Sequence, residues 1–192
     1  ENSDPFLELD HKAGYHVRAE WKLHRQGELS VGYYNNRAVP YKVVEGQYGW
    51  HTRFYHLGGK WQLNKNLVLI SQYLSGDTLM QNHYQRDVVN NSYANGFVAL
   101  TYKWGNFALN KRHKSTVRVE DFSVDDNDST LGDNNNENGQ ALTLNHSYHV
   151  NKGWFLSAEF NYIDSHRPAR YYTHQSVDLI EKQLQIASRY FF

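Results

Sequence analysis

Apolar and polar residues alternate along most of this chain with a period of two. In residues 14–23 the odd positions are apolar and the even ones are mostly polar or charged, and residues 154–163 and 178–192 show the same alternation. Successive side chains of a β-strand point to opposite faces, so each such segment predicts a strand with one apolar face. A sustained helical period is almost absent. We expect an all-β chain with strands at 14–23, 28–36, 49–63, 67–77, 95–109, 115–123, 140–150, 154–163 and 178–192.

Short turns and long connections alternate strictly between these strands. Three of the turns share an Asn-Lys pair, at Asn64-Lys65, Asn110-Lys111 and Asn151-Lys152, and His24-Arg25 is a looser copy. The spacing from one short turn to the next is about 40–46 residues, with a long polar connection halfway. This order predicts an up-and-down antiparallel meander of about 9–10 strands, with every short turn at one end.

The lengths of the strands and the places of the aromatic residues favour a membrane barrel. Strands of 9–11 residues suffice for a tilted crossing of a bilayer. Four tryptophans lie close to short turns, and the last residue falls at the same level, so we expect a membrane-interface row of Trp21, Trp61, Trp104, Trp154 and Phe192. A second aromatic level lies towards the long connections, and aliphatic residues separate the two. In a soluble sandwich, the same residues would fill a core.

Composition removes several other classes of protein. The 20 basic and 20 acidic residues balance, which gives no support for nucleic-acid binding. Cysteine is absent, so no disulfide or thiolate site is available. No apolar run is long enough for a transmembrane helix, whereas a mean hydropathy of −0.78 is compatible with a barrel that shows lipid only every second residue. We find no catalytic motif and expect neither an enzyme nor a cofactor.

The expected strand count raises a question about closure. The first clear strand begins at the long-connection end and the last finishes at the short-turn end, so the number is odd, whereas bacterial single-chain barrels have an even number. Residues 1–13 are then either an N-terminal loop or a short closing strand. Residues 1–192 form one domain, which is a whole barrel or the C-terminal part of a larger one. Gly58-Gly59 suggests a bulge, which leaves the face of Arg53 open.

Several short strings occur together along nearly the whole chain. They are Pro5 to Asp10 with Gly14-Tyr15 and Glu20-Trp21, Asn36-Arg37, QYGWHTRFYH from Gln47, Gln72 with Gly76-Asp77-Thr78, RVEDFSVDD from Arg118, Glu137-Asn138-Gly139, Asp164-Ser165 and Arg167 to Arg170. In these strings the chain resembles the C-terminal half of a Gram-negative porin-like outer-membrane family. The resemblance implies a trimeric or monomeric diffusion channel, and it supplies neither a substrate nor functional residues.

The polar faces of the strands supply the candidate site residues. In a barrel they point into the lumen, where charges set ion selectivity. The lumen candidates are Arg18, Lys22, Arg118, Glu120, Glu159, Gln185 and Arg189. The same residues could instead pair with one another and plug a structural barrel, or lie on the surface of a soluble domain.

Histidines and an acidic loop are weaker candidates for chemistry. The eleven histidines are scattered, and His51 and His56 are an odd number of residues apart and so share no face of a strand. The spacing of Asp133, Asn135 and Glu137 resembles part of a calcium loop. The glycine and the bidentate glutamate of that loop are missing, so a solvated acidic loop is the simpler interpretation.

The sequence therefore predicts a porin-type channel in the bacterial outer membrane for passive diffusion of small polar solutes or ions. Its partners would be the lipid bilayer, the solutes and the barrel-assembly machinery, because an alternating strand that ends in Phe resembles the signal which that machinery reads. Homo-oligomerisation is left open. The alternatives are a plugged structural barrel and a soluble β-sandwich that binds carbohydrate.

Overall fold

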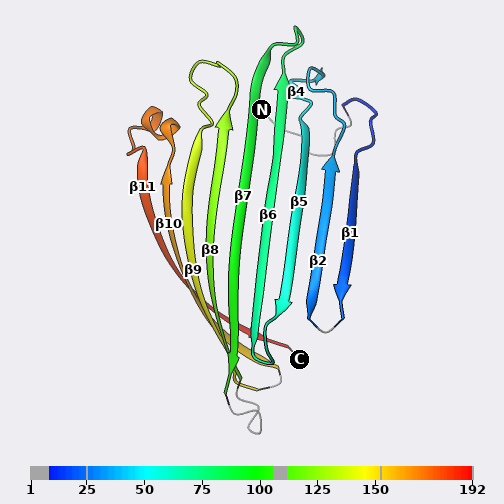
Figure 1. Cartoon of the computed structure of the whole chain (residues 1–192). Coiled ribbons are helices and arrows are strands. Elements are labelled where there is room, and N and C mark those ends of the chain that lie inside the picture. The colour runs from blue at the N-terminus through cyan, green and yellow to red at the C-terminus, as the bar shows by residue number, and fades with distance from the viewer. Residues whose placement is uncertain (1–8, 25, 106–111, 152, 192) are drawn as a thin grey trace.

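The computed structural model describes residues 9–24, 26–105, 112–151 and 153–191. Its main feature is one antiparallel sheet of nine long strands, ordered as they occur in the chain (Figure 1). The strands are β1 (Tyr15–Leu23), β2 (Gly27–Asn35), β5 (His51–Gln62), β6 (Leu67–Gln81), β7 (Asp87–Trp104), β8 (Arg112–Asp126), β9 (Glu137–His149), β10 (Trp154–His166) and β11 (Asp178–Tyr190). The all-β class and the up-and-down antiparallel order are confirmed.

The sheet is open, so the expectation of a whole barrel within this chain is wrong, and the alternative of a part of a larger barrel stays a prediction. Each inner strand pairs with its two neighbours in sequence, and β1 and β11 form the two edges. Within the described residues no strand pairs with the outer side of β1 or of β11. The nine strands form a curved wall that leaves one row of backbone hydrogen-bonding groups at each edge.

Several strands extend further towards the long connections than the apolar alternation predicts. β6 continues to Gln81 and β7 begins at Asp87, so residues 82–86 replace the long connection expected at 78–93. The added segments contain Asn90, Asn91 and Ser92, which pair with β6 in register. The buried pair Met80 and Val89 also lies in this part of the ladder, but adjacent apolar residues followed by Asn90, Asn91 and Ser92 leave no alternation to detect.

The remaining connections contain two small elements that the sequence did not predict. A hairpin of β3 (Val43–Val44) and β4 (Gln47–Tyr48) lies between β2 and β5, and a 3-10 helix, η2 (Pro168–Thr173), lies between β10 and β11. The Arg170 side chain donates to the Ser165 carbonyl at 3.1 Å and to the Val177 carbonyl at 3.2 Å, which ties this helix to the end of β10. No helix among the described residues is long and apolar enough to span a membrane.

The register divides the strand residues between two faces. Paired residues of an antiparallel ladder share a face, so the pairs Val17–Tyr33, Tyr33–Tyr55 and Tyr73–Leu57 trace one side of the sheet. We call this side the apolar face. Every large apolar residue of the nine long strands that is clearly exposed lies on it, including Val17 at 63% and Ile186 at 79% exposure. The other side is called the polar face.

The more buried residues lie on the polar face. Val68, Ala99 and Thr101 are nearly inaccessible there, with 5–6% of their surface exposed. Among the described residues no large side chain is completely buried. The sheet therefore has no ordinary hydrophobic core, and its exposed large apolar side chains lie on the opposite, less crowded face.

Glycine at position 59 allows an aromatic side chain to lie across the ladder. A Cβ atom built on Gly59 would fall about 2.0 Å from the Trp61 ring, so the indole covers this glycine. The register runs through Gly58 and Gly59 without a shift, so the expected bulge is wrong, and the irregularity lies between Met80 and Gln81. The continuous register also places Arg53 on the apolar face, opposite Asp77.

Candidate functional site

All the lumen candidates derived from the sequence lie on the polar face. The register places Lys22 and Arg118 in one row across the sheet, joined through Glu28, Lys60, Ile70 and Ala99. Glu20 and Glu120 occupy the next row towards the long connections, and Glu159 pairs directly with Gln185 one row the other way. Arg18 lies further towards the long connections than these rows, and Arg189 lies further towards the short turns.

The centre of the polar face holds an ion pair on β8. The Arg118 Nη2 atom lies 2.7 Å from Glu120 Oε2, and the Asn95 amide donates to Glu120 Oε1 at 2.6 Å. The guanidinium carbon of Arg118 lies 4.1 Å from the centre of the Phe97 ring, at cation–π distance. The buried Arg118 Nε atom has no hydrogen-bond partner. The guanidinium is thus held between a ring and a carboxylate, with one buried donor left without a partner.

A second polar group joins β9 to β10. The carboxylate of Glu159 accepts hydrogen bonds from the Asn145 amide at 3.1 Å and from the Asn161 amide at 3.2 Å. Thr143 donates to Asn161 at 2.8 Å, and Ser147 donates to Asn145 at 3.1 Å. This ladder continues the polar surface from the Arg118 pair towards β11. It offers carboxylate, amide and hydroxyl groups to a polar solute.

The candidates on β1 form a separate group at the edge of the sheet. Arg18 pairs with Glu20 at 2.5 Å, and each side chain is half exposed. The structure therefore does not bring Arg18 and Lys22 into contact with Arg118 or Glu120, although it places all of them on one face. The two groups would face each other across a lumen only if the wall closed.

Sequence reasoning did not include several polar-face residues among the candidates, because their contacts depend on the register between strands. They are Asn95, Phe97, Thr143, Asn145 and Asn161. Each lies at an alternate position of a correctly located strand, so the alternation could have included them. Which of them meet across strands follows only from the pairing.

Aromatic rings form a further row on the polar face near the long connections. His16, Tyr34 and Phe54 occupy one register row, and the Tyr34 and Phe54 rings stack with centroids 4.9 Å apart. The His16 and His56 rings lie 5.8 Å apart on the same face. His51 lies on the opposite face, as the odd spacing from His56 predicted.

The predicted interface tryptophans all lie on the apolar face towards the short turns. Trp21, Trp61, Trp104 and Trp154 belong to β1, β5, β7 and β10. The indole N–H groups of Trp104 and Trp154 donate to Ser115 at 3.2 Å and to Ser188 at 2.9 Å. Each ring therefore presents an apolar body with a satisfied polar edge. Phe192 lies outside the described residues.

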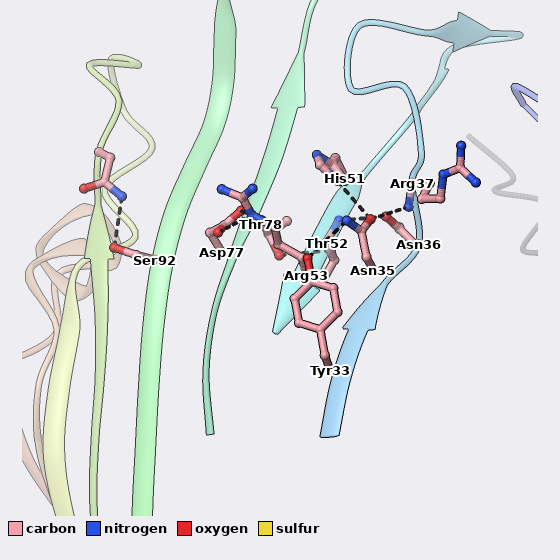
Figure 2. A network of polar contacts seen from close by, with 11 residues as sticks. Tyr33, Asn35, Asn36, Arg37, His51, Thr52, Arg53, Asp77, Thr78 and Ser92 are labelled. Atoms are coloured by element: carbon pink, nitrogen blue, oxygen red, sulfur yellow. Dashed lines mark hydrogen bonds and ion pairs between the residues drawn. The ribbon is translucent and has the colours of Figure 1, made fainter. Parts of the chain in front are cut away.

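The apolar face becomes polar at its long-connection end (Figure 2). Arg53 Nε contacts both carboxylate oxygens of Asp77 at 2.7 and 3.0 Å, although half of the Arg53 side chain remains exposed. Beside this pair, Asn35 bonds to the Tyr33 hydroxyl and to the His51 ring. This polar network marks one boundary of the apolar belt.

A shallow hollow of about 780 Å³ crosses the middle of the apolar face from β2 to β10. Two neighbouring register rows supply most of its lining, with Leu57 and Tyr73 in one row and Val98 and Leu142 in the other. The hollow therefore runs across the strands and not along one of them.

The suggested calcium ligands have other partners. The Asn135 amide donates to Asp133 at 2.9 Å, and the Glu137 carboxylate lies 3.7 Å from Arg170 and 3.9 Å from Arg167. Within the described ranges no group of three His, Asp or Glu side chains is arranged to hold a metal. The loop is hydrogen-bonded internally, and its Glu137 lies near two arginines.

One carboxylate of this loop fixes it to the neighbouring strand. Asp128 accepts hydrogen bonds at 2.8 Å from the backbone N–H groups of Asn90 and Thr130. Burial by itself would raise the pKa of Asp128, but the hydrogen bonds from Thr130 and Asn90 outweigh it and lower the pKa below its ordinary value. The ionised carboxylate therefore holds the connection after β8 against the beginning of β7.

Comparison with the models of known families, with curated proteins and with solved structures gives no match for this chain.

Proposed function

We propose that this chain forms part of the wall of a transmembrane β-barrel in the bacterial outer membrane, and that the barrel is a passive channel for small polar solutes or ions. One observation carries the proposal: the clearly exposed large apolar residues of the nine strands all lie on one face. A water-soluble sheet would bury such a face, and lipid is the solvent that favours its exposure.

The size of the apolar belt supports this function. On β10 five outward positions, Trp154, Leu156, Ala158, Phe160 and Tyr162, alternate with inward ones over nine residues. At about 3.3 Å per residue this segment is about 30 Å long, and a tilt of about 40° leaves about 23 Å across the membrane. The apolar band of known outer-membrane barrels is about 25 Å tall.

The belt crosses the strands obliquely, as tilted strands require. On β1 it begins at Tyr15, close to the long-connection end, and Tyr33 continues it on β2. On β8 and β9 the row of Tyr33 holds Ser123 and Asn138, and the next row holds Asp121 and Gln140. Large apolar residues start there two rows nearer the short turns than Tyr33, at Val119 and Leu142. A belt that shifts along successive strands is the stagger that a barrel needs to close.

The open edges define what the proposed barrel still needs. β1 and β11 lie at opposite ends of the nine-strand order. Closure would require further strands between them, supplied by the same polypeptide or by another copy. We assign the apolar residues of β11, with Leu184 at 68% and Ile186 at 79% exposure, to recognition by the barrel-assembly machinery and to lipid contact.

The polar face would line the lumen and filter solutes by size and charge. Arg118, Glu120 and Glu159 would set the local field, and the neighbouring amides would exchange hydrogen bonds with passing solutes. One observation favours a second function, that of a plugged structural barrel. Arg118 pairs with Glu120, and Glu159 is satisfied by two amides, so the polar groups largely bind one another.

Electrical recording in planar bilayers tests the proposal and separates these functions. The full chain, purified in detergent, is expected to insert and to give discrete conductance steps. Insertion without conductance would support the plugged barrel. A chain that stays monodisperse without detergent and does not enter liposomes would contradict both membrane functions, and binding of oligosaccharides would then favour the soluble sandwich.

A further inference from the structure

We propose that His113 and His146 form a binding site for one divalent cation that prefers imidazole ligands, such as Cu²⁺ or Zn²⁺. His113 lies on β8 and His146 on β9, as diagonal neighbours on the apolar face near the short turns. The Nδ1 atom of His113 lies 3.2 Å from the Nε2 atom of His146. The site is independent of whether the barrel conducts.

The separation of the two nitrogens suits a shared ion. Imidazole nitrogens bind Zn²⁺ at about 2.0–2.1 Å, so two of them at an angle of about 90–110° lie about 2.9–3.4 Å apart. The observed 3.2 Å falls within that range. The ion would lie beside the line between the nitrogens, which a modest rotation of the rings allows, and water would complete its coordination.

A neighbouring serine fixes the histidine on β9. The Nδ1 atom of His146 lies 3.0 Å from the Ser115 hydroxyl oxygen, which also accepts the indole N–H of Trp104 at 3.2 Å. In the tautomer in which Nδ1–H donates to Ser115, the Nε2 lone pair of His146 faces His113. Histidine ligands of metals are commonly oriented in this way by a bond to the other ring nitrogen.

Aromatic rings fix the histidine on β8. The His113 ring stacks on Trp104, with centroids 4.2 Å apart and an angle of 13°, and on Tyr148 at 4.7 Å and 27°. The register places His113 between these two partners, so the plane of its ring is set from both sides. A preset pair of ligands loses little conformational entropy when an ion binds.

The ligand set decides which cations would bind. Neighbouring register positions on this face hold Tyr102, Ala158 and Leu156, and none of them is acidic. Neutral imidazoles without a carboxylate favour Cu²⁺ and Zn²⁺ over Ca²⁺ and Mg²⁺. In that tautomer of His146, the His113 Nδ1–H donates to His146 Nε2 when no ion is bound. On binding, the His113 proton moves to Nε2 of the same ring, so both imidazoles stay neutral.

Titration of the full chain in detergent micelles with Cu²⁺ tests the site. Electron paramagnetic resonance should show one bound Cu²⁺ per chain with hyperfine splitting from two nitrogens. His113→Gln and His146→Gln should each weaken binding about 100-fold, and Ser115→Ala about 10-fold. His149→Gln is the matched control, because this histidine of β9 lies on the polar face, and it should bind as the wild type does.

A measurement on the wild-type chain avoids dependence on how the variants fold. Bound Cu²⁺ should quench Trp104, one of the five tryptophans, and so reduce the total fluorescence by up to about one fifth, whereas Trp104→Phe should abolish that loss. Equal binding by the wild type and the His113 and His146 variants would contradict the site. Absence of quenching and of a two-nitrogen spectrum would show that the pair is only a hydrogen bond.

Discussion

The guanidinium carbon of Arg118 lies over the ring of Phe97, a diagonal neighbour on the adjoining strand, 4.1 Å from the centre of the ring. The contact fixes a long, flexible side chain on the polar face and directs its terminal nitrogen to Glu120. The ring also desolvates one side of the cation, which strengthens the interaction between the two charges. Arg118 is therefore positioned on the polar face by both a ring and a carboxylate.

Replacing this charge is expected to change the ion selectivity of the channel. Arg118→Gln leaves Glu120 unpaired, so the permeability ratio should shift towards cations by about 2–3-fold, and Glu120→Gln should shift it towards anions. Reversal potentials in a salt gradient measure both ratios. Arg53→Gln is the matched control, because it removes the same charge from the apolar face. A shift equal to that of Arg118→Gln would contradict the assignment of the faces.

Charges placed on the apolar belt should block membrane insertion. Val17→Arg and Leu156→Arg would each expose an arginine to lipid, at a cost of about 2–4 kcal/mol near the middle of the bilayer. Glu159→Arg introduces the same side chain on the polar face and should leave insertion intact while it alters selectivity. Flotation with liposomes measures the inserted fraction. Equal loss of insertion in all three variants would disprove the division into faces.

A side chain at position 59 should displace the indole that covers it. Gly59→Ala places a Cβ atom in the volume of the Trp61 ring and should destabilise the folded chain by about 1–2 kcal/mol. Gly96→Ala is the control, since its Cβ atom would lie 3.5 Å from Tyr73, an ordinary contact. Urea unfolding in detergent gives both values. If the double change Gly59→Ala with Trp61→Ala shows no coupling, the indole does not lie over Gly59.

The connection after β8 should loosen in acid. The pKa of Asp128 is lowered in the folded state, so its ionised form contributes stability that is complete above the ordinary carboxyl pKa of about 3.9 and is lost as the pH falls through the folded value. Hydrogen exchange of the Asn90 and Thr130 amides should therefore accelerate below about pH 4. Asp128→Asn should remove this dependence. If the exchange rates of the wild type, corrected for the intrinsic effect of pH, stay constant in acid, the stabilising role of ionised Asp128 is contradicted.

The period-2 alternation was enough to locate the nine long strands and their order. It located β1 and β10 well because every second residue there is apolar, as from Tyr15 to Leu23. It failed where both faces are polar, as in the part of β7 that holds Asn90 and Asn91. There the buried Val89 pairs with Met80, but Asn90, Asn91 and Ser92 interrupt the apolar alternation that would reveal a strand.

Closure and cross-strand contacts were beyond the sequence for a different reason. The alternation assigned Arg118 and Glu159 to one face, because a face depends only on position within a strand. That Asn95 binds Glu120, or that His113 meets His146, depends on the pairing of separate strands. The barrel was expected from the pattern of strands. This pattern predicts the strands of the wall, but it does not predict which segments pair with the edge strands β1 and β11.

The central claim is that the apolar face contacts lipid and the polar face contacts water, and a spin-label scan of β10 tests it most directly. The chain has no cysteine, so single cysteines at residues 154–166 can be labelled without background. In liposomes, labels at Leu156, Ala158 and Phe160 should be most accessible to oxygen, and those at Ser157, Glu159 and Asn161 to a water-soluble nickel complex. A scan in which both reagents reach all positions equally would contradict the claim.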